Sequence, residues 1–198
     1  MAEPERLLLA TRNGHKLREF TRLLAPAGIA VDPLPEPVRL PPEVGSTFAE
    51  NALPKARSAA EATGRAAIAD DSGIEAAALG GRPGVRSARF AGEHAGDEEN
   101  LAKLMREAPA GSRLRYVCVL AYVDPDADEV RLFAGECSGR LAAQRRGNGG
   151  FGYDPAFLVD GDVRGRTMAE LDDAAKDAVS HRGAAARALL AWLAAGRA

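Results

Sequence analysis

The stretch AAIADDSG, residues 66–73, decides how this chain is interpreted, because an apolar run leads directly into two carboxylates and a Ser-Gly break. The apolar residues predict a strand that ends at Asp70. Successive strand residues point to opposite faces, so at most one of Asp70 and Asp71 can face a site while the strand geometry lasts. Carboxylate oxygens suit a hard cation such as Mg²⁺. Asp-Ser-Gly is also ordinary turn chemistry, so this stretch alone leaves both interpretations open.

Length and composition place the chain among soluble globular proteins. It has 198 residues, of which 46% are hydrophobic and 27% are charged, so one domain with a sizeable core is expected. The formal net charge of −2 does not indicate a polyanion-binding surface, and we expect no nucleic-acid partner. The apolar runs at 7–10 and 188–195 are too short for a signal peptide or a membrane span. We therefore expect a cytoplasmic protein with two buried thiols, Cys118 and Cys137, although a disulfide stays open.

Strands and helices alternate in the first half of the chain, and a hairpin follows. This order predicts a mixed α/β sheet flanked by helices rather than a purely parallel sheet. The expected helices cover 16–27, 47–62, 97–108 and 182–195, with a further short helix near 74–79. The expected strands cover 6–11, 29–34, 66–70, 114–123, 129–139 and 157–159, and a Pro-rich surface loop covers 33–45.

The first candidate site is the turn TRNGHK, residues 11–16, between the first strand and the first helix. A helix N-terminus presents free backbone N–H groups and the positive end of the helix dipole, which together favour an anion. Lys16 adds a cation one turn into the helix. The alternative is that Thr11 or Asn13 caps the helix and Lys16 is solvated.

Two further stretches combine charged and amide side chains with helical spacing. Glu50, Asn51 and Lys55 lie in the second expected helix, where Asn51 and Lys55 share a face. A capping box at residues 47–50 explains Glu50 without a ligand. Near the C-terminus, Lys176 and the run at 180–183 supply hydrogen-bond donors, unless Ser180 only caps a helix and its neighbour is a surface histidine. No nucleophilic triad or zinc-ligand spacing is present.

The last candidate is the glycine-rich loop GNGGFGYDP, residues 147–155. Four glycines in six residues exclude a regular element and permit a close approach of the backbone to a ligand. Phe151 within them suits stacking on a flat base. The alternative is that Phe151 and Tyr153 fasten the loop to the core.

Taken in order, these motifs resemble the inosine triphosphate pyrophosphatase family, the dITP/XTP or non-standard purine nucleoside triphosphate pyrophosphatases. The resemblance runs from about residue 7 to residue 193. The motifs that carry it are Thr-x-Asn-x-x-Lys at 11–16, Phe-x-Glu-Asn-Ala-x-x-Lys-Ala at 48–56, Ala-Asp-Asp-Ser-Gly at 69–73, Pro-Gly-Val-x-Ser-Ala-Arg-Phe at 83–90, Gly-Phe-Gly-Tyr-Asp-Pro at 150–155 and Ser-His-Arg-Gly at 180–183.

The resemblance implies a single ITPase-like catalytic domain over 1–198, an elongated two-lobed subunit with a central cleft, and a homodimer. It also implies Mg²⁺-dependent hydrolysis of ITP, dITP or XTP to the monophosphate and pyrophosphate. The implied metal ligands are Glu50 and Asp71, and Asp71 is also the implied proton acceptor. The implied substrate contacts are Thr11, Arg12, Asn13, Gly14, His15, Lys16, Lys55, Ser72, Phe151, Gly152, Tyr153, Asp154, Lys176, His181 and Arg182.

Donors at the base edge would explain selectivity for oxo-purines. An adenine amino group cannot accept from Lys176, His181 or Arg182, whereas a 6-oxo group can. Two departures from the family pattern stand out: Pro54 inside the second helix, and Ala156 in place of a larger apolar residue. Two other interpretations stay open, a Maf-type nucleotide pyrophosphatase, whose motifs are not found, and a non-catalytic nucleotide-binding module.

Overall fold

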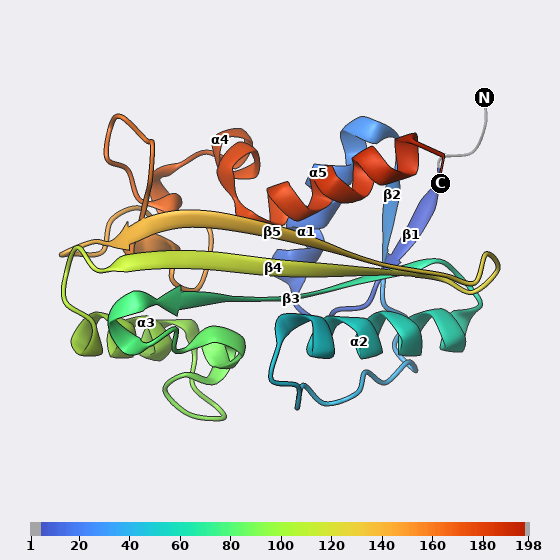
Figure 1. Ribbon diagram of the computed structural model, residues 1–198, viewed down its shortest axis with the longest axis horizontal. Helices are drawn as coiled ribbons and strands as arrows, with labels where there is room; N and C mark the ends of the chain where they lie inside the picture. Colours follow the sequence, from blue (N-terminus) through green and yellow to red (C-terminus); the bar gives the residue numbers. More distant parts are fainter. Residues whose placement is uncertain (1–4, 197–198) are drawn as a thin grey trace. The chain divides into compact units, whose positions relative to one another are not determined.

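One mixed sheet of six strands, in the order β2-β1-β3-β4-β5-β6, organises the chain (Figure 1). The structure is a computed structural model, and it describes residues 5–196. β1 pairs in parallel with β2 and with β3, whereas β5 and β6 are antiparallel, so the predicted mixed sheet is confirmed. The strands are β1 (Arg6–Leu9), β2 (Ala30–Pro33), β3 (Ala67–Ala76), β4 (Arg113–Asp124), β5 (Glu129–Leu141) and β6 (Phe157–Val159).

The helices agree with the predicted positions, with one addition. They are α1 (Gly14–Leu24), α2 (Phe48–Thr63), α3 (Asp97–Glu107), α4 (Asp173–Val179) and α5 (His181–Ala194). The sequence interpretation did not include α4, a short helix that Asp172 caps by accepting from the amide of Ala175. Pro54 does not break α2, which continues for 16 residues with Pro54 on its exposed side.

β3 differs from its prediction, because it does not break at Ser72-Gly73 but continues to Ala76. One contact with the continued strand comes from a distant part of the sequence. The hydroxyl of Ser87 accepts a hydrogen bond from the amide of Ile74 at 2.8 Å and donates to the carbonyl of Gly84 at 2.6 Å. A side chain thus satisfies a backbone amide of the continued strand. The short helix expected near 74–79 is reduced to a single 3₁₀ turn, Ala77–Leu79.

The chain forms two compact units. Unit 1 contains the described residues up to Asp71 together with Cys118–Gly135 and those from Arg182 onward. Unit 2 contains Ser72–Val117 and Glu136–His181. The long strands β3, β4 and β5 each contribute residues to both units.

In unit 1, the alternation of side chains along β1 builds two separate cores. Leu7 and Leu9 pack with α1 and α5, and Leu8 packs with α2 on the opposite face (Figure 1). The buried face of α2 is made of small residues, Ala52, Ala56, Ala59 and Ala60. Both faces of the sheet are therefore covered, as parallel strands require.

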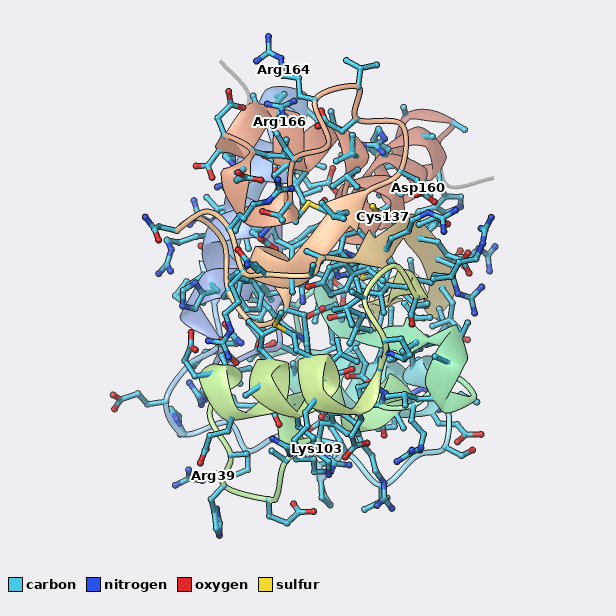
Figure 2. All side chains as sticks on the ribbon, turned by 90° about the vertical axis from the view of Figure 1, so that its left-hand side faces the viewer. Arg39, Lys103, Cys137, Asp160, Arg164 and Arg166 are labelled. Carbon is cyan, nitrogen blue, oxygen red and sulfur yellow. The ribbon has the colours of Figure 1, made fainter. Side chains whose placement is uncertain are left out.

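Unit 2 has one core, formed by the distal part of β3, the first residues of β4, the end of β5, β6 and α3. Its large buried members include Ile74, Leu101, Leu104, Tyr116, Tyr153, Phe157 and Met168. The turn after β6 is charged. Arg164 points outward at its tip (Figure 2), and Arg166 donates a hydrogen bond to Asp162 Oδ1 at 2.7 Å.

The two cysteines, one in each unit, are free and buried, which confirms the predicted buried thiols. Burial raises the pKa of Cys137 to about 11. Within residues 5–196, no helix is both long and apolar enough to cross a bilayer. The homodimer, the cytoplasmic location and the expected lack of a nucleic-acid partner stay predictions.

Candidate active site

The two adjacent aspartates of β3 are both buried, and they have different partners. Asp70 Oδ1 lies 3.0 Å from Lys16 Nζ on α1, and Asp70 Oδ2 lies 3.3 Å from Nε of Arg182 on α5. Burial alone would raise the pKa of Asp70, but the charges of Lys16, Arg182 and Lys55 outweigh it and hold that pKa well below its usual range. Asp70 is thus a fixed negative charge among cations.

Arg182 links this cluster to a second carboxylate. Its Nη1 donates to Oε2 of Glu19 at 3.1 Å, and both side chains are buried. The planar guanidinium therefore joins α5 to α1 and β3 within unit 1. The predicted contact of Arg182 with the base stays a prediction, whereas the contacts present in the structure are with Glu19 and Asp70. Glu19 is a site neighbour that the motifs did not indicate.

Asp71 has a different environment from Asp70. Its Oδ2 accepts a hydrogen bond from Nδ2 of Asn51 on α2 at 2.9 Å. Burial raises the pKa of Asp71, and the charge of Glu43 adds to this, while Lys55 and Asn51 act in the opposite direction. A carboxylate with a raised pKa accepts a proton more readily than an ordinary one. The surroundings of the two aspartates therefore shift their pKa values in opposite directions.

Lys55 and Glu43 are the charged residues that act on Asp71 from α2 and from the loop before it. Lys55 Nζ is buried, and it donates to Glu43 Oε1 at 2.5 Å and to the carbonyl of Asp70 at 2.8 Å. Glu43 lies in the loop that the sequence predicted as a Pro-rich surface segment. Next to it, the amide of Gly45 donates to Oδ1 of Asn51 at 2.7 Å. A Cβ at Gly45 would lie 2.6 Å from the Cβ of Glu50, so the loop can approach α2 this closely only with glycine.

The carboxylate of Glu50 makes the capping box that was the alternative interpretation. Oε2 accepts from the amide and hydroxyl of Ser46 at 2.7 and 2.8 Å and from the amide of Thr47 at 3.3 Å. These hydrogen bonds lower the pKa of Glu50. Its predicted role as a metal ligand stays a prediction. Across the described residues, no three His, Cys, Asp or Glu side chains gather in a group that could hold a metal ion.

The N-terminal turn confirms the capping alternative and corrects the idea of a solvated lysine. Asn13 Oδ1 accepts from the amides of His15 and Lys16 at 2.8 and 3.2 Å, and Thr11 Oγ1 accepts from the amide of Asn13. Lys16 is not solvated, because its ammonium group contacts buried Asp70.

Arg12 donates to four carbonyls of the 34–38 loop, those of Leu34, Pro35, Glu36 and Val38. Gly14 is the first residue of α1, and the side chain of His15 contacts Arg18 at 2.9 Å.

In unit 2, Asp154 organises the glycine-rich loop. Its Oδ2 accepts from Lys176 Nζ at 2.7 Å and from the amide of Phe151 at 3.1 Å, and its Oδ1 accepts from the hydroxyl of Tyr116 at 2.8 Å. Gly150 has a φ of +69°, and a Cβ there would lie 2.1 Å from Asp154 Oδ2. Only glycine permits the loop to fold so closely over this carboxylate.

The two aromatic residues of the loop behave differently. Tyr153 is buried, and its hydroxyl donates to the carbonyl of Ser87 at 2.7 Å, so Tyr153 does fasten the loop to the core. Phe151 is only half-buried and lies outside the core cluster, with Lys176 Nζ 5.2 Å from its ring centroid. The amide of Gly152 donates to Asp97 of α3 at 3.0 Å and gives the loop another anchor. The loop is thus held from several sides while the Phe151 ring remains partly accessible.

His181 is buried and is not a surface residue, which corrects that alternative. Its ring stacks on Tyr116, with centroids 4.6 Å apart and an interplanar angle of 7°. Sequence reasoning missed Tyr116, because it lies in the middle of an apolar strand pattern and its partners are 38 and 65 residues away. Ser72, a predicted substrate contact, is half-buried in β3, and its role stays a prediction.

Comparison with known proteins agrees with these motifs. A dITP/XTP pyrophosphatase of Mycolicibacterium paratuberculosis is 48% identical and covers 93% of each chain, and one of Mycobacterium tuberculosis is 47% identical and covers 96% of each. A HAM1 protein from Coxiella burnetii has a TM-score of 0.84 at 40% identity, over 96% of this chain and 98% of that one. The Staphylococcus aureus Ham1 protein has a TM-score of 0.82 at 38% identity, over 97% and 100%. Residues 7–192 match the Ham1 family, and the chain therefore belongs to that family.

Proposed function

We propose that this protein hydrolyses the non-standard purine nucleoside triphosphates dITP, XTP and ITP to the monophosphate and pyrophosphate, and so removes them from the nucleotide pool. The relatives named dITP/XTP pyrophosphatase match nearly its whole length. The observation that carries the proposal is the division between two adjacent carboxylates. Asp70 is held charged by Lys16 and Arg182, and Asp71 has a raised pKa beside Asn51.

The proposed reaction breaks the bond between the α-phosphorus and the oxygen that bridges to the β-phosphate. A water oxygen bonds to the α-phosphorus, pyrophosphate leaves with the bridging oxygen, and Asp71 accepts a proton from the water. Lys16 and Lys55 supply positive charge for the phosphates. A phosphate at the N-terminal turn competes with the Asn13 cap for the amides of His15 and Lys16.

Magnesium is part of the proposal. Mg²⁺ typically binds through one or two carboxylates and completes its shell with waters and substrate phosphate oxygens, so the small number of carboxylates near Asp71 suits it. The residues that would hold it are Asp71 with Glu50, as the motifs predict, or Glu43, whose charge acts on Asp71. When bound, Mg²⁺ lowers the pKa of a coordinated water and neutralises phosphate charge.

The base-binding role falls on unit 2. Phe151 offers a half-buried ring for stacking, which tolerates any purine. Lys176 and His181 are the proposed donors to the oxo group, and Arg182 is the further donor that the motifs imply. Adenine carries an amino group at this position, which cannot accept a hydrogen bond from these donors. The binding of ATP would therefore be weaker.

A pyrophosphate-release assay with ITP, dITP, XTP, GTP, ATP, CTP and UTP in the presence of Mg²⁺ tests the proposal. We expect pyrophosphate and the monophosphate from the first three substrates, and loss of activity on chelation with EDTA that added Mg²⁺ restores. Release of orthophosphate, equal turnover of ATP, or full activity after chelation would contradict the corresponding part of the proposal. Nucleotide binding without turnover would favour a non-catalytic module.

A further inference from the structure

A buried tyrosine that no motif indicated, Tyr116, contacts two of the predicted substrate-binding residues of unit 2, Asp154 and His181. Tyr116 donates its hydroxyl to Asp154 Oδ1 at 2.8 Å. The ring stacks on His181 and lies 4.5 Å, centroid to centroid, from Phe157. One strand residue thus contacts both the glycine-rich loop and the first residue of α5.

The hydrogen bond from Tyr116 fixes the orientation of the Asp154 carboxylate. Because Oδ1 is held by the phenol, Oδ2 is directed at the amide of Phe151 and at Lys176, 3.1 and 2.7 Å away. The fit around Oδ2 is close, since any Cβ at Gly150 would overlap it. Small rotations of this carboxylate would therefore move the loop and the ammonium group together.

We propose that Tyr116 is a positioning residue for base binding, and that it acts through Asp154 on Phe151 and Lys176. This inference rests on the function proposed above. Tyr116 itself contacts no substrate in this scheme. A buried hydrogen bond to a charged acceptor is strong enough to select one orientation of a side chain.

The variant Tyr116→Phe tests this role, because it keeps the ring that contacts His181 and Phe157 and removes only the hydroxyl. We expect KM for dITP and XTP to rise about tenfold, equivalent to about 1.4 kcal/mol. The value of kcat should stay within about twofold, because a loss of uniform binding affects KM alone. Hydrogen–deuterium exchange of the 147–154 segment should become faster, since the Phe151 amide loses its fixed acceptor.

Strand β4 contains a matched control. Tyr122 is also buried, and its hydroxyl donates to Asp124 Oδ2 at 3.0 Å. Tyr122→Phe removes the same atoms from the same strand and should leave KM and the exchange of 147–154 unchanged. Equal effects of both variants on KM and exchange would mean that loss of any buried phenol loosens the strand, and would overturn the proposal.

A double-mutant cycle with Asp154→Asn tests the route through Asp154. The asparagine oxygen can still accept from Tyr116, but the amide that replaces Oδ2 cannot accept from Phe151 or Lys176. The KM effects of Tyr116→Phe and Asp154→Asn should therefore be less than additive. Full additivity would overturn the proposal, and so would an unchanged exchange rate in Tyr116→Phe. If the unmodified protein releases no pyrophosphate from any nucleotide, the proposed function fails, while the exchange comparison still decides the role of Tyr116.

Discussion

Two buried carboxylates, Asp70 in unit 1 and Asp154 in unit 2, have different kinds of partners. Asp70 lies on a strand, and three cations act on it. Asp154 lies at the end of a glycine-rich loop, with one lysine and two neutral donors, Tyr116 and the Phe151 amide. Charge dominates the first centre and the geometry of hydrogen bonds the second. The comparison suggests that unit 1 changes should affect the chemical step and stability, and unit 2 changes should affect binding.

The largest expected effect is on turnover, from Asp71→Asn. The variant keeps the shape and loses the proton acceptor, so we expect kcat to fall by ~10²–10⁴-fold with a smaller change in KM. In the unmodified enzyme, kcat should decline as the pH falls through the raised pKa of Asp71, because the protonated acid cannot accept a proton. Steady-state kinetics across pH measures both. Near-normal kcat in the variant would move the role to another residue, with Asp70 as the next candidate.

Asp70→Asn should mainly change stability. It leaves Lys16 and Arg182 without their shared carboxylate, which costs about 3–5 kcal/mol for a broken buried pair. Because the folded-state pKa of Asp70 is lowered, this stabilisation is present above its unfolded pKa, about 4, and is lost as the pH falls toward the folded value. Urea unfolding at pH 7 and at pH 3 should therefore give a smaller difference at pH 3. Asp124→Asn, at a buried carboxylate bound to a phenol, is the control and should cost about 1 kcal/mol.

Phe151→Ala should weaken binding of every purine triphosphate in similar proportion. Loss of base–aromatic stacking costs about 1–3 kcal/mol, and it should appear in KM rather than in kcat. The measurement is kcat and KM for ITP, XTP and GTP. An unchanged KM would mean that the half-buried ring stabilises the loop and does not bind the base. A fall in kcat alone would contradict the assignment of substrate binding to unit 2.

The smallest expected effect separates two candidate metal ligands. Glu43→Gln should raise the Mg²⁺ concentration for half-maximal activity by about tenfold, because the charge of Glu43 acts on Asp71. Glu50→Gln should change it less, since a glutamine preserves the capping box that already occupies this side chain. A Mg²⁺ titration of both variants decides the matter. The reverse order would assign the site to Glu50, as the motifs predicted.

Features set by neighbouring residues could be predicted from the sequence. The Asn13 cap, the capping box at 47–50 and the helical stripe of α1 all depend on contacts within four residues, and each is present in the structure. The mixed sheet also followed from the alternation of elements, whereas the spatial order of its strands was not predicted. α4 was missed although Asp172 signals its start, because a seven-residue helix rich in alanine has no apolar stripe to detect.

Features set by distant residues could not be predicted. The hydrogen bond between Ser87 and the continued part of β3 spans thirteen residues, and the Tyr116–Asp154 bond spans 38 residues. The contact of Lys16 with Asp70 could not be predicted, because nothing in the local sequence indicates that Asp70 would fold against this lysine. The motifs indicated candidate side chains whose roles stay predictions, whereas the partners of each side chain required the structure.

The alanine face of α2 determines how close this helix lies to β3. The buried face of α2 packs in the same core as Ala67 and Ala69 of β3, and it consists of Ala52, Ala56, Ala59 and Ala60. Because both surfaces carry only methyl groups, the helix and the strand can approach closely. The helix axis is therefore close enough to β3 for the short Asn51 side chain to reach Asp71. Even one added methyl group at this contact would act as a spacer. The separation between α2 and β3 is thus set by alanine methyl groups, and these methyl groups fix the distance that Asn51 has to span to reach Asp71.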